Sequence, residues 1–98
     1  GSLTLDPVLR EAAKMLPFEE IHVLNINTGA RFTTYIIEGE RGSGVVCLNG
    51  AAARLGEPGD LIIALTYCQL DDTEAKTHIP TMVYVDAQNK ITNIDGPA

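Results

Sequence analysis

Apolar and polar residues alternate in short runs along most of this chain, which is the period of β-strands that bury one face. Residues 21–26 predict one strand, Asn27-Thr28-Gly29 predicts a turn, and residues 31–37 predict the returning strand of a hairpin. The runs around Leu61 and Met82 are apolar enough that we expect them to be fully buried. Turn-forming residues separate the remaining predicted strands, which are residues 45–48, 61–70, 81–86 and 90–94.

Helical signals are few and local. Asp6 is a good N-cap, Pro7 suits the first helical position, and the apolar spacing that follows predicts a short helix ending before Pro17. The segment Asn49-Gly50-Ala51-Ala52-Ala53 follows a predicted strand and favours a turn into a second short helix. Many short strands with one or two short helices predict a mainly β chain folded as a small barrel.

Length and charge narrow the possible functions. A chain of 98 residues forms a single domain with a thin margin of stability, which contacts with a partner chain or other copies would improve. The formal net charge is −6 and the 7 Lys and Arg residues are scattered, so nucleic-acid binding is not expected. No apolar run reaches the roughly 18 residues of a membrane span and no signal peptide is recognisable, so we expect a soluble, cytoplasmic protein with no membrane partner.

Cysteine and histidine give little sign of chemistry. Cys47 and Cys68 have no zinc-site spacing and are too few for a disulfide framework, so we expect reduced, apolar strand residues. His22 and His78 lack a second ligand at metal spacing, so no metal site is expected. Candidate chemistry therefore lies elsewhere, in three short segments.

The first segment is Gly1-Ser2, which is also a common remnant of a cleaved expression tag. The second is residues 31–35, where strand alternation places Arg31 and Tyr35 on one face and Thr34 on the other. Such an Arg and Tyr offer a bidentate grip on a carboxylate and a proton donor, although an ordinary exposed strand would have the same pattern. The third is residues 49–53, whose backbone N–H groups either bind an oxyanion or form a tight corner.

In order and spacing, these segments resemble the α-chain of the pyruvoyl-dependent aspartate 1-decarboxylase family. The resemblance runs from residue 1 to about residue 86 and also includes Gly39-Glu40-Arg41-Gly42-Ser43-Gly44 and Pro58-Gly59-Asp60. Each of these short segments alone is a weak sign of the family, but all of them together at the family's spacing are a specific one. The resemblance implies a double-psi β-barrel, assembled as a homotetramer with active sites between neighbouring subunits.

The resemblance also implies an activity and a cofactor. The family converts L-aspartate to β-alanine and carbon dioxide, a supply of precursor for pantothenate and coenzyme A. Its proenzyme cleaves itself at the bond that matches Gly1-Ser2. The Ser2 hydroxyl would attack the Gly1 carbonyl, the ester would eliminate, and the dehydroalanine would hydrolyse to a covalent pyruvoyl group. That group forms a Schiff base with the substrate amine and accepts the charge left by decarboxylation.

Roles for other residues follow from matching positions in the family. Thr34 matches the threonine that assists self-cleavage, Arg31 the arginine that binds a substrate carboxylate, and Tyr35 the tyrosine proposed to donate a proton to the carbanion. The pocket wall is matched by Asn49, which would hold carbonyl groups, and by Gly50, Ala51 and Ala52, of which the two alanine amides would contact the substrate.

Two features depart from the family pattern. About two dozen residues that precede the cleavage site form a short β-chain in the family and are not in this sequence. We therefore expect that β-chain as a partner, or else a truncated chain. Gly1 is still joined to Ser2, and a chain in that state has no electrophile. The alternatives are an unprocessed or truncated barrel fragment without activity and, against the acidic charge, a DNA-binding barrel of related architecture.

Overall fold

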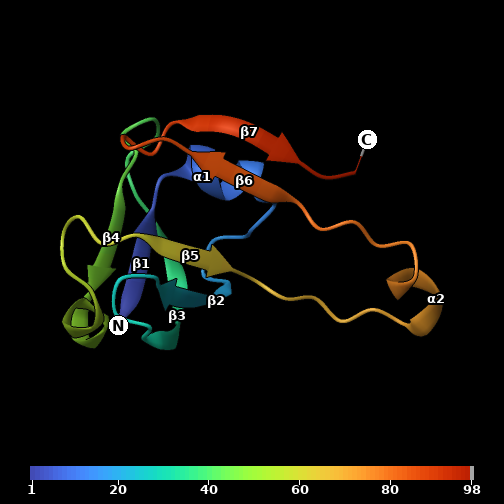
Figure 1. Cartoon of the computed structure of the whole chain (residues 1–98), viewed down its shortest axis with the longest axis horizontal. Coiled ribbons are helices and arrows are strands. Elements are labelled where there is room, and N and C mark those ends of the chain that lie inside the picture. Colours follow the sequence, from blue (N-terminus) through green and yellow to red (C-terminus); the bar gives the residue numbers. More distant parts are fainter. Residues whose placement is uncertain (98) are drawn as a thin grey trace.

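The structure is a computed structural model that describes residues 1–97, and it is mainly β, as predicted (Figure 1). Its strands are β1 (Ser2–Leu5), β2 (Glu20–Asn25), β3 (Arg31–Glu38), β4 (Val46–Asn49), β5 (Ile62–Leu65), β6 (Met82–Val85) and β7 (Ile91–Asp95). Its helices are all short and are α1 (Pro7–Ala12), the 3-10 helix η1 (Gly50–Leu55) and α2 (Asp72–Ala75).

The larger sheet has the strand order β4-β1-β3-β2-β5 and curls like half of a barrel (Figure 1). β1 runs parallel to β3 and antiparallel to β4, while β2 is antiparallel to both β3 and β5. The predicted hairpin of residues 21–37 is confirmed as β2 and β3, and the predicted C-terminal hairpin as β6 and β7, which form a separate sheet. β1 was not predicted. It places the start of the chain inside the sheet, between two strands.

α1 begins as the sequence predicts. Asp6 is the N-cap, its carboxylate accepts a hydrogen bond from the Val8 amide at 2.9 Å, and Pro7 occupies the first helical position. The helix ends at Ala12, well before Pro17, and the chain then turns through Phe18, whose φ is +64°. The Phe18 amide donates to the Ile36 carbonyl at 2.9 Å, which fixes this turn to β3.

No helix among residues 1–97 is long and apolar enough to cross a membrane.

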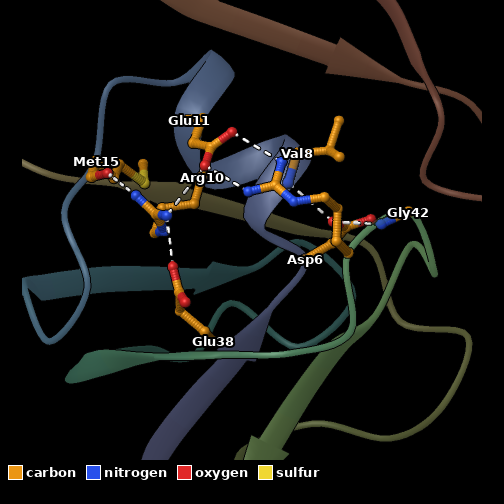
Figure 2. A network of polar contacts seen from close by, with 8 residues as sticks. Asp6, Val8, Arg10, Glu11, Met15, Glu38 and Gly42 are labelled. Carbon is orange, nitrogen blue, oxygen red and sulfur yellow. Dashed lines mark hydrogen bonds and ion pairs between the residues drawn. The ribbon is translucent and has the colours of Figure 1, made fainter.

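Asp6 also ties α1 to the turn between β3 and β4 (Figure 2). Its carboxylate is 3% exposed and accepts two further hydrogen bonds, from the Gly42 amide at 3.0 Å and the Gly44 amide at 2.9 Å. Burial alone would raise the pKa of Asp6, but the backbone N–H donors outweigh it and hold the pKa below its ordinary value of 3.8. The carboxylate is therefore charged and acts as a structural cross-link.

Arg10 makes a second link beside it (Figure 2). The guanidinium is nearly buried, and it donates to the Met15 carbonyl at 2.9 Å and to the Glu38 carboxylate at 2.5 Å. The neighbouring Glu11 accepts a long hydrogen bond from Arg10 at 3.4 Å and two shorter ones from the exposed Arg41, at 3.0 and 2.7 Å. Together these contacts hold the end of β3 and the following turn against α1.

The core is formed by apolar residues of β1, β2, β3 and α1, and Leu3, Ile21, Val23 and Ile36 have no exposed surface. The predicted burial around Leu61 and Met82 is wrong, because these two side chains are 64% and 49% exposed. The predicted strand 61–70 is confined to β5, after which the chain leaves the sheet toward α2 (Figure 1). An apolar run does not reveal whether its face is covered by its own chain.

Candidate active site

Ser2 starts β1, is 4% exposed, and lies directly opposite Asn49 of β4. Asn49 Nδ2 donates to the Ser2 hydroxyl at 3.0 Å and to the Thr4 hydroxyl at 2.8 Å. On the other side of this amide, Cys47 Sγ donates a weak hydrogen bond to Asn49 Oδ1 at 3.5 Å. The amide N–H groups are thus fixed toward β1, and Ser2 Oγ accepts a hydrogen bond while keeping its own proton.

The start of η1 packs closely around Gly1. A methyl group placed on Gly1 would lie 3.0 Å from Ala52 Cβ, and one placed on Gly50 would lie 3.3 Å from Gly1 Cα. Gly50 has a φ of +62°, in the left-handed region that favours glycine. Because neither glycine carries a side chain, the backbone after Asn49 can wrap the first residue of the chain. A side chain on Gly1 would crowd Asn49 and Ala52.

An open cavity of about 540 Å³ begins at Gly1. Of the other predicted site residues, Thr34, Tyr35, Ala51 and Ala52 also line it. Thr34 and Tyr35 point to opposite faces of an ideal strand, and the β2–β3 pairing has no bulge at these residues. Both residues nevertheless line the cavity. The structure therefore joins the three predicted segments at one place.

Ser2, Asn49 and Gly50 lie next to Gly1 but are not part of the cavity wall. Arg31 is not part of it either. It begins β3 on the exposed face, and its Nη2 donates to the Tyr67 hydroxyl at 2.8 Å. No carboxylate among residues 1–97 forms an ion pair with it. Within one chain, Arg31 is thus separate from Gly1 and Ser2, and its charge is not neutralised.

The sequence analysis missed several residues of the cavity wall. Phe18, Glu20, Phe32, Thr33 and Leu55 also line it. Glu20 pairs with Tyr35 in the β2–β3 register, so counting back from the predicted turn would have placed it beside Tyr35. Phe18 gave no such signal, because its turn is set by a positive φ and by a contact with Ile36.

Metal and disulfide chemistry have no visible basis in the described part of the chain. Residues 1–97 contain no group of three His, Cys, Asp or Glu side chains placed to hold a metal ion. Cys47 and Cys68 are free thiols, as expected, but both are exposed. Cys68 lies outside the strands, so its prediction as an apolar strand residue is wrong, and Cys47 belongs to the site because it contacts Asn49.

Comparison with known proteins gives a consistent result. A family model described as aspartate decarboxylase matches residues 1–92. Two proteins named aspartate 1-decarboxylase, from Pelotomaculum thermopropionicum and Thermoanaerobacter pseudethanolicus, are each 56% identical over 94 residues, which is 96% of this chain and 71% and 80% of those proteins. A third of that name, from Heliobacterium modesticaldum, is 57% identical over 91 residues, which is 93% of this chain and 69% of that protein. The chain therefore belongs to the aspartate decarboxylase family.

Proposed function

We propose that this protein decarboxylates L-aspartate to β-alanine and carbon dioxide, using a pyruvoyl group made from Ser2 by self-cleavage of the Gly1–Ser2 bond. The names of its relatives give the substrate and reaction. The observation that carries the proposal is the placement of Ser2, whose hydroxyl is buried, held by Asn49, and adjacent to a residue that opens a cavity. In the cell, the product would supply pantothenate synthesis in the cytoplasm.

The residues around Ser2 fit a pyruvoyl group. Such a group is small and planar, and it would take the buried position of Ser2, opposite Asn49. When present, its ketone supplies an electron sink for the charge that decarboxylation leaves on the substrate. Elimination removes the Ser2 Oγ, so Asn49 Nδ2, which donates to that oxygen, would then be free to donate to the ketone oxygen on the neighbouring α-carbon.

The same contacts would prepare Ser2 for self-cleavage. Its hydroxyl keeps its proton while accepting from Asn49, so the oxygen is oriented and its proton remains free for transfer. We assign to Thr34, which lines the same cavity as Gly1, the hydrogen bond to the carbonyl that the hydroxyl attacks. Attack converts the Gly1–Ser2 amide to an ester and frees the Ser2 amine, after which elimination releases the Gly1 carboxylate.

Substrate handling would fall to the cavity wall. Tyr35 lines the cavity and is 43% exposed, and we assign it the proton returned to the α-carbon. The backbone N–H groups of Ala51 and Ala52, at the start of η1, would bind the substrate. Arg31 does not line the cavity of its own chain, so we place it in the cavity of a neighbouring copy within a homotetramer. A short β-chain from the same precursor would complete the site.

Mass spectrometry combined with an assay for β-alanine tests the main proposal. The purified protein should show an N-terminal carbonyl that reacts with hydroxylamine, together with aspartate-dependent β-alanine formation. Ser2→Ala is the matched control, since it lacks only the hydroxyl, and it should show neither property. An intact Gly1–Ser2 terminus with no β-alanine formed would contradict the proposal and favour an inactive, unprocessed barrel.

Subunit complementation tests the shared site. Arg31→Ala and Tyr35→Phe should each process normally and turn over aspartate poorly. Mixed tetramers of the two variants should regain activity, because roughly one site in four would combine a native Arg31 with a native Tyr35 from a different copy. Mixtures no more active than the two variants alone would show that both residues serve the same site of one chain.

A further inference from the structure

Three neighbouring strands bring a row of side chains to the exposed face of the sheet beside Arg31. In the β2–β3 register, Thr33, the next residue on the face of Arg31, pairs with His22. His22 also pairs with Leu65 at the end of β5, and the ring of Tyr67, two residues later, packs against the His22 ring. Residues from β3, β2 and the segment after β5 are therefore neighbours, although they are far apart in sequence.

Tyr67 connects this row directly to Arg31. Its hydroxyl accepts the hydrogen bond from Arg31 Nη2 at 2.8 Å, and its ring meets the His22 ring edge to face, with centroids 4.9 Å apart and planes at 77°. His22 is itself 3.7 Å from a Glu20 carboxylate oxygen on the same strand. The tyrosine is thus supported on one side and holds the arginine on the other.

Arg31 has a particular need of such support. Its side chain is exposed, and a free arginine loses rotamer freedom when it grips a ligand, which weakens binding. A guanidinium has five N–H bonds, and the contact with Tyr67 uses one. The other four are left for a carboxylate, and the fixed plane favours a bidentate grip.

We propose that Tyr67 is a positioning residue that holds Arg31 in the orientation that binds the side-chain carboxylate of aspartate. This inference rests on the proposed function, in which Arg31 binds that carboxylate in the cavity of a neighbouring copy. The Tyr67 hydroxyl acts on substrate only through Arg31, so it governs affinity for the dicarboxylate and neither self-cleavage nor the proton transfer to the α-carbon.

The test is Tyr67→Phe in the processed enzyme, with rates divided by the amount of carbonyl-bearing N-terminus. We expect the KM for aspartate to rise about 3- to 10-fold, the range that one net hydrogen bond gives, with kcat changed less than about twofold. The inhibition constant of succinate, which has two carboxylates and no amine, should rise by the same factor, while that of butyrate stays unchanged. Tyr84→Phe is the matched control, because its hydroxyl contacts only Met82 Sδ, at 4.0 Å, within residues 1–97.

The outcomes separate the inference from the proposed function. If the KM for aspartate and the inhibition constant of succinate are both unchanged in Tyr67→Phe, the role of Tyr67 is overturned. An equal rise in the inhibition constants of succinate and butyrate would overturn it as well. If Arg31→Ala keeps a normal KM, the assignment of Arg31 itself fails. If the unmodified protein makes no β-alanine, the proposed function fails. Equal melting temperatures of Tyr67→Phe and wild type are expected, since the phenol is 61% exposed.

Discussion

Replacing Asp6 should destabilise this fold more than any other single change at a charged residue of α1. Its carboxylate accepts three backbone hydrogen bonds. The Val8 amide donates at 2.9 Å and the Gly42 amide at 3.0 Å, both to Oδ1, while the Gly44 amide donates to Oδ2 at 2.9 Å. Because the side chain is 3% exposed, water cannot readily replace these bonds.

The size of the effect follows from each lost contact. Loss of an N-cap costs about 1 kcal/mol. Loss of the partly buried Gly42 contact should cost about 1 kcal/mol, and leaving the buried Gly44 amide unpaired about 1–3 kcal/mol. Asp6→Ala should therefore lower the free energy of unfolding by about 3–5 kcal/mol, out of the roughly 5–15 kcal/mol that a native protein has.

Asp6→Asn is the graded control. Its single carbonyl oxygen can keep the Val8 and Gly42 contacts, but its amide nitrogen would face the Gly44 N–H, so only that contact is lost. We expect a cost of about 1–3 kcal/mol, clearly smaller than that of the alanine variant. Urea unfolding followed by circular dichroism, at one fixed protein concentration, measures both. Equal costs for the two variants would refute the additive contribution of the three amides.

The lowered pKa of Asp6 adds a pH dependence. A carboxyl group whose pKa in the folded protein lies below its unfolded value contributes stability that is complete above the unfolded value, near 3.8, and is lost as pH falls through the folded pKa. The stability difference between wild type and Asp6→Asn should therefore be constant near neutral pH and shrink below about pH 4. A difference that is unchanged at acid pH would exclude the charged carboxylate as its source.

Three further changes probe the site and its support. Tyr35→Phe should process normally but turn over aspartate slowly, and a wild-type kcat would require another proton donor. Gly50→Ala should slow self-cleavage, measured by intact mass over time, because its methyl group would lie 3.3 Å from Gly1 Cα and its φ of +62° costs about 1–2 kcal/mol with a side chain. Arg10→Met should lower the melting temperature by several degrees, because it removes the buried guanidinium and leaves its hydrogen-bond partners without a donor. Arg41→Met removes only an exposed ion pair, so it should leave the melting temperature nearly unchanged.

Local signals predicted well those parts of the fold that local chemistry determines. Asp6 and Pro7 mark the start of α1 because an N-cap and a first-turn proline act within three residues. The turn at Asn27-Thr28-Gly29 predicts the β2–β3 hairpin because it needs only the positive φ of Gly29, which is +77°. The positions of Thr34 and Tyr35 on β3 followed from that hairpin.

Elements that depend on distant contacts were not predictable in this way. β1 has four residues, and it is extended because it pairs with β3 and β4, which lie 30 or more residues away. The apolar run after Leu61 was expected in the core, yet Leu61 and Ile63 are 64% and 53% exposed. Periodicity indicates which residues share a face, but it does not show what packs against that face.

Charge supports the proposal that Arg31 serves the site of another copy. The chain has a formal net charge of −6, and Glu20 is the charged side chain that lines the cavity. A dicarboxylate entering the cavity of one chain would therefore meet the Glu20 carboxylate and no Lys, Arg or His side chain among the lining residues, which costs binding energy. A guanidinium without an acidic partner, held on an exposed face by a neutral phenol, can supply that cation to another copy. Tyr67 suits this purpose better than a carboxylate would, because a carboxylate would fix Arg31 equally well and neutralise the charge that aspartate needs.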